Sequence, residues 1–279
     1  MMMALGQLLS SISTVGAILA AMAVVALLET AVPLHARGRW HRTHLGPNLA
    51  LTFITFATNI VFNGALVMTL TWLQSTNFGL LHMFELPRPV SVLAVVLVLD
   101  FSFYVAHVSM HRIPAFWRFH RVHHSDSVVD VTTTIRQHPG EGVIRYTFMA
   151  AFAFALGASP GAFAVYRSWS AFNALLEHAN IRAPLWLDRA LSLLTTWPNM
   201  HKVHHSRTAT DANTNYGNIF SLFDRVFLTF TPSDRGMNIA SGLDGFDDPP
   251  AQTTAGLLAM PFRDVGVSGT AAVAVRQSS

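Results

Sequence analysis

Residues 49–73 contain no Asp, Glu, Lys or Arg, and most of their side chains are apolar. Two further stretches are nearly as apolar. Residues 12–34 contain one charged residue, Glu29, and residues 90–107 contain one, Asp100. About 20 mostly apolar residues cross the hydrocarbon core of a bilayer as a helix. Within lipid, a helix satisfies every backbone N–H and C=O of the segment. The sequence therefore predicts a chain whose solvent is largely lipid.

The charge content supports the same conclusion. Charged residues make up 12% of the chain, about half of the roughly 25% that is typical of soluble domains. The net charge of +3 is not the basic excess that indicates a nucleic-acid partner. The first apolar stretch lacks the basic start of a cleaved signal peptide, so we expect it to be retained as a span.

A fourth apolar stretch, residues 146–176, is interrupted by one charged residue, Arg167. The group Gly157–Gly161 (GASPG) lies near its middle, and Gly and Pro there predict a turn between two helices of a membrane hairpin. We expect an all-α fold of about four to five membrane spans, including this hairpin, with a helical cap on the cytoplasmic side.

The chain divides by composition into three parts. Residues 1–89 are predicted to hold N-terminal transmembrane helices and loops, and residues 90–232 a histidine-rich domain. Residues 233–279 are predicted to be a C-terminal tail that is partly disordered, because Pro, Thr, Ala, Gly and Ser are frequent in it.

The orientation follows from the short basic loops, which stay in the cytoplasm. Residues 35–46 hold three Arg, whereas residues 74–89 hold one and belong outside. The third span then ends at His107 on the cytoplasmic side, and the hairpin returns the chain to that side. The basic residues that mark it are Arg37, Arg39, Arg42, Arg112, Arg118, Arg121, Arg182, Arg189 and Lys202.

The chain has no cysteine and 14 histidines. Thiolate metal sites, Fe–S clusters, disulfides and a cysteine nucleophile are therefore excluded. Any metal must be held by His, Asp or Glu. Ten of the histidines lie between His107 and His205, and all ten are expected on the cytoplasmic side.

Eight of these histidines form three clusters with helical spacing. Residues three or four apart lie on one helix face, so each cluster aims its imidazoles at one point. Adjacent histidines point about 100° apart, which suits two neighbouring metals better than one. The candidate ligands, including His178 as a ninth, are His107, His111, His120, His123, His124, His178, His201, His204 and His205.

Nine imidazoles exceed the three or four protein ligands of a single zinc, so the sequence predicts a two-metal site. For His138, direct ligation and a role in the surrounding pocket both stay open. We expect His35, His41, His44 and His82 to be interfacial residues without a chemical role.

Asp100 and Tyr104 share a helical stripe with His107 and His111, and we count Asp100, Tyr104 and His138 as candidate catalytic residues. A carboxylate within a membrane span suggests function. Asp100 either fixes the tautomer of a ligand imidazole or forms a structural pair with another helix.

The motifs together resemble those of the sterol desaturase/fatty acid hydroxylase superfamily of integral-membrane di-iron enzymes. The resemblance covers residues 90–232, about half of the chain, and three histidine boxes in this order are a specific signal. The matching motifs are DFSFY (100–104), HVSMH (107–111), HRVHH (120–124), RQHP (136–139), EHAN (177–180), HKVHH (201–205), NYG (215–217) and NIFSLFDR (218–225).

The resemblance implies two Fe ions that activate O₂ as a co-substrate and oxidise a C–H bond of a lipid from the bilayer. It leaves hydroxylation and desaturation open, as well as sterol-like and fatty-acyl substrates. It also implies a separate electron donor, cytochrome b5-like or ferredoxin-type. The bacterial inner membrane is the expected location, and zinc is an expected substitute for iron in purified protein. The alternative is a two-zinc membrane hydrolase that acts on a lipid, with Glu141 or Glu177 as its base.

Overall fold

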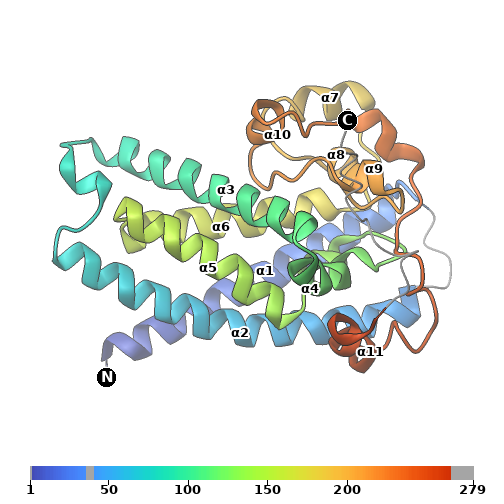
Figure 1. Cartoon of the computed structure of the whole chain (residues 1–279), viewed down its shortest axis with the longest axis horizontal. Coiled ribbons are helices and arrows are strands. Elements are labelled where there is room, and N and C mark those ends of the chain that lie inside the picture. The colour runs from blue at the N-terminus through green and yellow to red at the C-terminus, as the bar shows by residue number, and fades with distance from the viewer. Residues whose placement is uncertain (1, 36–40, 265–279) are drawn as a thin grey trace, which may run out of the picture.

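The computed structural model describes residues 2–35 and 41–264, and among these it contains helices and short 3₁₀ turns but no strand. Five long helices run side by side along the long axis of the molecule, and the short elements gather mainly at one end (Figure 1). The long helices are α1 (Met2–Ala31), α2 (His41–Ser75), α3 (Arg88–Arg112), α5 (Pro139–Leu156) and α6 (Pro160–His178).

Three segments are long and apolar enough to cross a membrane: Ser13–Ala31, His44–Met83 and Arg88–Arg112. Large apolar side chains stand exposed on their outer surfaces, for example Leu27 at 70% and Trp72 at 60% exposed. Exposed apolar surface on this scale fits contact with lipid. The predicted all-α fold with membrane-spanning helices is confirmed. The total number of spans stays a prediction.

The predicted hairpin turn is also confirmed. α5 ends at Gly157, which has a left-handed backbone (φ 70°), and the Ser159 side chain caps α6 by accepting the N–H of Ala162 at 3.2 Å. Pro160 takes the first position of α6, where its missing N–H costs nothing. Gly157 packs directly against Gly79 in the loop after α2, so the two loops at this end of the bundle touch through glycines.

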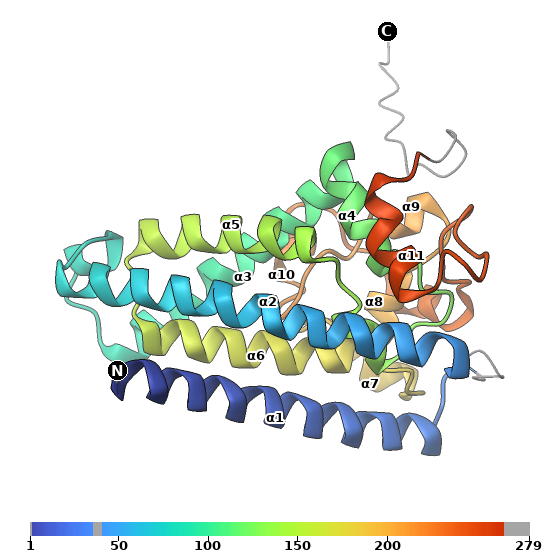
Figure 2. The ribbon, with the colours of Figure 1, turned by 90° about the horizontal axis from the view of Figure 1, so that it is seen from below.

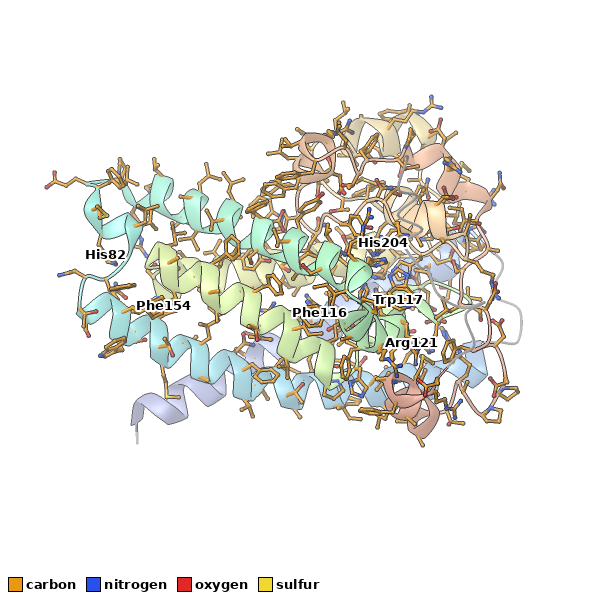
Figure 3. The ribbon with its side chains drawn as sticks, viewed as in Figure 1. His82, Phe116, Trp117, Arg121, Phe154 and His204 are labelled. Atoms are coloured by element: carbon orange, nitrogen blue, oxygen red, sulfur yellow. The ribbon has the colours of Figure 1, made fainter. Side chains whose placement is uncertain are left out.

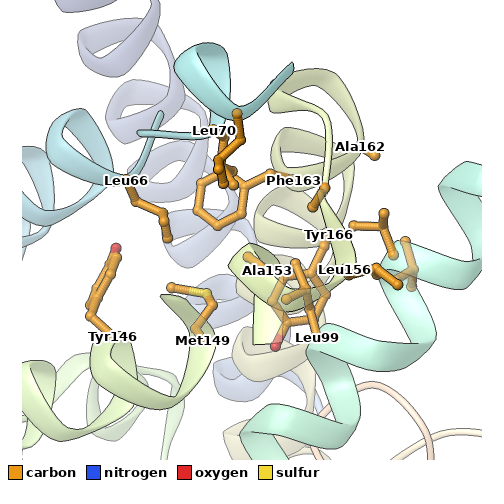
Figure 4. Close-up of a cluster of buried hydrophobic side chains, with 14 of the residues drawn as sticks. Leu66, Leu70, Leu99, Tyr146, Met149, Ala153, Leu156, Ala162, Phe163 and Tyr166 are labelled. Atoms are coloured by element: carbon orange, nitrogen blue, oxygen red, sulfur yellow. The ribbon is translucent and has the colours of Figure 1, made fainter. Parts of the chain in front are cut away.

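The core of the bundle lies between α2, α3, α5 and α6. Figure 4 shows side chains from all four helices meeting there, among them Leu70, Leu99 and Phe163. α1 lies along the outside of α6 (Figure 2), where Met22 and Val25 pack near Leu175. Burial of these apolar surfaces holds the helices in register.

Glu29 ties α1 to the end of the bundle that carries the histidines. Its buried carboxylate accepts the backbone N–H groups of Val131 and Asn180, each at 2.8 Å. This bond network places the C-terminal end of α6 against the 3₁₀ turn η2 (Val131–Ile135).

A sharp corner follows α3. Ile113 is extended, as expected for a residue before proline, and Pro114 begins α4 (Pro114–His124). The second histidine cluster thus lies on a helix that turns back beside the first. The third cluster lies on α8 (Pro198–His204) and its C-cap residue His205, and α8 packs against α6.

One short element, η1 (Leu80–Met83), lies at the end of the bundle away from the histidines. The remaining short elements surround the end that carries the histidines; they are α7 (Leu185–Leu191), α9 (Ala209–Ala212), α10 (Leu222–Val226), η3 (Ser233–Asn238), α11 (Thr254–Ala259) and η4 (Met260–Phe262). α11 packs on α2 and η4 on α4, and Arg121 reaches the carbonyls of Met260 and Arg263. Residues 233–264 of the expected tail thus form packed elements, whereas 265–279 lie outside the described residues.

The glycine contact yields a stability prediction. In Gly157→Ala, the new Cβ would sit 2.3 Å from the Phe78 carbonyl oxygen, on a left-handed backbone. We expect a loss of more than about 1 kcal/mol in the free energy of unfolding, measured as a lower thermal midpoint in detergent. Gly161→Ala is the matched control, because nothing lies within 4 Å of its Cβ position. Equal midpoints for the two variants would contradict the prediction.

Candidate metal centre

The nine predicted histidines form two neighbouring buried groups. Within each group, the nitrogen atoms that could bind a metal all lie within 4.8 Å of one another. Figure 3 shows His204 and Trp117 near the C-terminal end of α3, whereas His82 lies at the opposite end of the molecule. One group consists of His107, His111, His120, His124 and His204, and the other of His123, His178, His201 and His205.

Adjacent histidines are divided between the groups. His123 and His124 belong to different groups, as do His204 and His205. This is the arrangement that the 100° rotation between neighbouring residues predicts. His178 completes the smaller group from the end of α6.

The spacing of the Nε2 atoms fits metal coordination. In the larger group, the Nε2 atom of His120 lies 3.1 Å from that of His107 and 3.2 Å from that of His124. In the smaller group, the His178 Nε2 atom lies 3.1 Å from those of His123 and His201. Nitrogens bound at about 2.0–2.1 Å to one ion are about 3.0–3.4 Å apart. Each group is therefore compact enough to surround one ion.

Backbone carbonyls fix the tautomer of three imidazoles. The Nδ1 atoms of His107, His178 and His204 lie 2.8 Å from the carbonyl oxygens of Tyr216, Ala174 and Thr214, respectively. A carbonyl only accepts, so each Nδ1 carries the proton and each Nε2 keeps its lone pair for a metal.

Two buried glutamates lie beside the imidazoles. Glu141 Oε2 is 3.3 Å from His120 Nδ1, and Glu177 Oε1 is 3.8 Å from His178 Nδ1. Glu177 Oε1 also lies 4.0 Å from His201 Nε2. From the sequence, both glutamates were considered only as hydrolase bases, and these contacts were not predicted. Because Glu177 is adjacent to His178, the sequence could have indicated that Glu177 lies near the histidines. Glu141, in contrast, meets His120 only because α5 packs on α4.

Several imidazole nitrogens are buried without a hydrogen-bond partner among the described residues. They include both ring nitrogens of His111 and Nε2 of His204. A buried polar atom without a partner costs about 1–3 kcal/mol, and a metal ion would satisfy the one lone pair that each neutral imidazole carries. The donor set of nitrogens without thiolates suits iron or zinc. The residues present thus fit a pair of metal ions.

Burial keeps imidazoles of both groups neutral. Desolvation, reinforced by neighbouring histidines, lowers the pKa of His120, His123, His124, His201 and His205 well below the ordinary value. Desolvation lowers the pKa of His204 to about 4. The unprotonated imidazole is the form that binds metal.

Asp100 does not contact an imidazole in the described structure. Its carboxylate accepts the N–H groups of Ile219 and Phe220 at 3.0 Å each. Asp100 was expected to hold an imidazole or to pair with another helix, but its partners lie in the non-helical segment before α10 (Leu222–Val226). Asp224 accepts the N–H groups of Tyr216 and Gly217. Two buried carboxylates therefore hold the segment whose Tyr216 carbonyl orients His107.

Tyr104 supports the same segment. Its hydroxyl lies 2.9 Å from Thr229 Oγ1, which donates to Asp224 at 2.7 Å, and its ring stacks on Phe227 with 5.4 Å between centroids. Tyr104 thus lies next to the metal groups but outside them.

His138 lies outside both groups and caps α5. Its Nδ1 accepts the Gly140 N–H at 2.9 Å, and its Nε2 donates to the Leu258 carbonyl at 3.3 Å. The expectation for His44 was wrong, because His44 is buried and its Nδ1 lies 3.0 Å from Asp126 Oδ1. The residues around His44 on α2 do not predict its burial, because the segment that contacts it, at Asp126, is distant in the sequence.

A cavity lies inside the bundle, directly beneath the histidines. It is bounded by α1, α2, α3, α5, α6 and η2. Ala106, next to His107, lines it, as does Ala174, whose carbonyl holds His178. None of the nine histidines is among the described residues that line the cavity, but its wall includes a neighbour of His107 and the residue whose carbonyl holds His178.

The sequence model of the family described as "Fatty acid hydroxylase" matches residues 92–229, which include all nine histidines. The chain belongs to the fatty acid hydroxylase family. The resemblance found from the histidine boxes is thereby confirmed.

Relatives within this family carry the names of lipid oxygenases. An ornithine lipid hydroxylase of Rhizobium tropici is 29% identical over 180 residues, which are 64% of this chain and 53% of that protein. An alkylglycerol monooxygenase of Caenorhabditis elegans is 29% identical over 153 residues, which are 54% of this chain and 27% of that protein. The chain thus spans about half or less of the length of these relatives. No solved structure gave a significant match.

The contact behind His120 can be tested by substitution. Glu141→Gln keeps the size of the side chain but removes the carboxyl group beside His120 Nδ1. We expect metal affinity to fall by about 10–100-fold, as for other partners of metal-bound histidines, measured by competition with a chelator. Glu85→Gln, in the exposed loop at the far end, is the control. Wild-type affinity in Glu141→Gln would contradict this role.

Acid should destabilise the metal-free protein. Unfolded imidazoles titrate near pH 6.5, whereas burial keeps His204 neutral down to about pH 4. Between these values the unfolded state binds more protons, so the free energy of unfolding falls as the pH falls. We expect the thermal midpoint in detergent to drop between pH 6.5 and 4. A constant midpoint over this range would contradict the burial of neutral imidazoles.

Proposed function

We propose that this chain is a membrane-bound di-iron oxygenase that uses O₂ to hydroxylate or desaturate a C–H bond of a lipid. The observation that carries the proposal is the division of nine buried imidazoles into two adjacent groups, each compact enough for one ion. The family and the names of the relatives support lipid oxidation. A bound pair of irons would supply the redox chemistry that activates O₂.

The residues of the chain would prepare this chemistry in three ways. The carbonyls of Tyr216, Ala174 and Thr214 orient imidazoles before metal binds. Asp100 and Asp224 hold the segment that bears one of these carbonyls. The bundle cavity would hold the substrate next to the metal groups and exclude water.

The two-zinc hydrolase has no comparable support. Its candidate base Glu141 lies between His120 and Arg145, with Oε1 3.8 Å from the Arg145 guanidinium. A carboxyl group that lies between an imidazole and a guanidinium is suited to orient the imidazole. The named relatives are hydroxylases and monooxygenases.

Each hydroxylation consumes O₂, two electrons and two protons, and yields an alcohol and water. A separate donor, cytochrome b5-like or ferredoxin-type, would supply the electrons, because the cysteine-free chain holds no Fe–S cluster. We place the protein in a bacterial inner membrane with its metal site facing the cytoplasm. Exposed Arg112, Arg182 and Arg189, at the end of the bundle that carries the histidines, fit this orientation. Lys202 does not contribute, because it is buried and bonded to the Ala179 carbonyl.

Iron content and oxygen consumption test the proposal. Protein prepared anaerobically with iron should hold two irons per chain and consume O₂ only when both reductant and lipid are supplied. His178→Ala removes a ligand of the smaller group and should lower the iron content and abolish the uptake. His82→Ala, exposed at the opposite end, should behave as wild type. Two zinc ions and no redox response, with iron available throughout, would contradict the proposal.

A further inference from the structure

Two arginines lie inside the bundle. Arg145 on α5 and Arg167 on α6 both line the cavity beneath the histidines. A charged side chain within a membrane-embedded bundle is costly and indicates a functional site. Neither arginine is a predicted metal ligand, and Arg145 is linked to His120 only through Glu141.

The two guanidinium groups differ in their partners. Arg145 lies 3.8 Å from Glu141 Oε1 and 4.7 Å from the centre of the Phe103 ring. Arg167 lies 5.4 Å from the centre of the Tyr146 ring, and its Nε is buried without a hydrogen-bond partner among the described residues. Phe103 and Tyr146 also line the cavity, so both guanidinium groups are held against its wall.

The rest of the wall lacks negative charge. No Asp or Glu is among the described residues that line the cavity. Its neutral polar groups include Asn59 and Gln137, and apolar side chains such as Ile18, Phe56 and Met149 form much of the remainder. A cavity with apolar walls and two guanidinium groups matches an amphiphile with an acidic group.

The cationic wall lies close to the metal groups. Arg145 follows Glu141 by four residues, about one helical turn, and Glu141 lies 3.3 Å from His120. A lipid whose acidic group binds here would place a neighbouring part of its chain at the histidines.

We propose that this cavity selects lipids that bear an oxyanion, a carboxylate or a phosphate, and that Arg167 together with Arg145 binds that oxyanion. This inference deepens the proposed oxygenase function, on which it rests for the fate of the bound lipid. Arg forms bidentate, charge-assisted hydrogen bonds with carboxylate and phosphate groups. A neutral lipid would leave the buried Nε of Arg167 without a hydrogen-bond acceptor, which is unfavourable.

Binding of three probes with the same alkyl chain tests the inference on the full chain in neutral detergent. The probes are hexadecanoate, hexadecyl phosphate and hexadecanol, and the readout is the dissociation constant by native mass spectrometry. We expect wild type to bind at least one anion about tenfold or more tightly than the alcohol, the order expected of one charge-assisted hydrogen bond. The ranking of the two anions identifies the favoured group.

Variants assign the preference to the cavity. Arg167→Met should remove the preference for the anion, and Arg167→Lys should retain part of it. Ala171→Phe, on the cavity wall, should weaken all three probes. Arg189→Met removes an exposed charge paired with Asp234 on the cap and should leave the preference unchanged.

Two results would overturn the inference: equal affinities of wild type for all three probes, or an anion preference that survives Arg167→Met. If Arg167→Met does not fold, an anion preference that is undiminished in Arg167→Lys, or affinities for all three probes that are unchanged in Ala171→Phe, has the same meaning. Binding is measured without turnover, so its failure is distinct from failure of the oxygenase proposal, which the iron and oxygen assay decides.

Discussion

The burial of nine imidazoles in two touching groups is the constraint on which the rest of this structure depends. Buried imidazoles that faced one another as cations would repel, and as neutral rings they leave lone pairs without donors. Two metal ions would resolve both problems at once. The carbonyls at Nδ1, the glutamate behind His120 and the two carboxylates that hold residues 216–220 then have one common purpose, which is to keep each ring oriented before metal binds.

The membrane bundle supplies the rigidity that such a centre needs. α3 packs on both helices of the hairpin, and it carries His107 and His111 at its last turns. The hairpin returns the chain so that His178 meets the third cluster on α8. Helices that pack along their full length place side chains more exactly than loops do. The same packing leaves the cavity beneath the histidines, lined by α1, α2, α3, α5 and α6.

Local patterns in the sequence predicted the features that depend on local geometry. Helical spacing indicated which histidines share a face, adjacent histidines indicated two groups, and GASPG indicated the turn of the hairpin. The features that were missed depend on contacts between distant segments. Glu141 reaches His120, Asp100 reaches the backbone at Ile219, and Asp126 covers His44. Each pair joins residues from separate elements, and no periodicity within one element encodes such a meeting.

The most direct test of this account is the position of the metal ions in the iron-loaded protein, determined from anomalous diffraction at the iron absorption edge. The account predicts two peaks, one surrounded by the five imidazoles of the larger group and one by the four of the smaller group. A single peak, or two peaks of which either lies outside these groups, would contradict it.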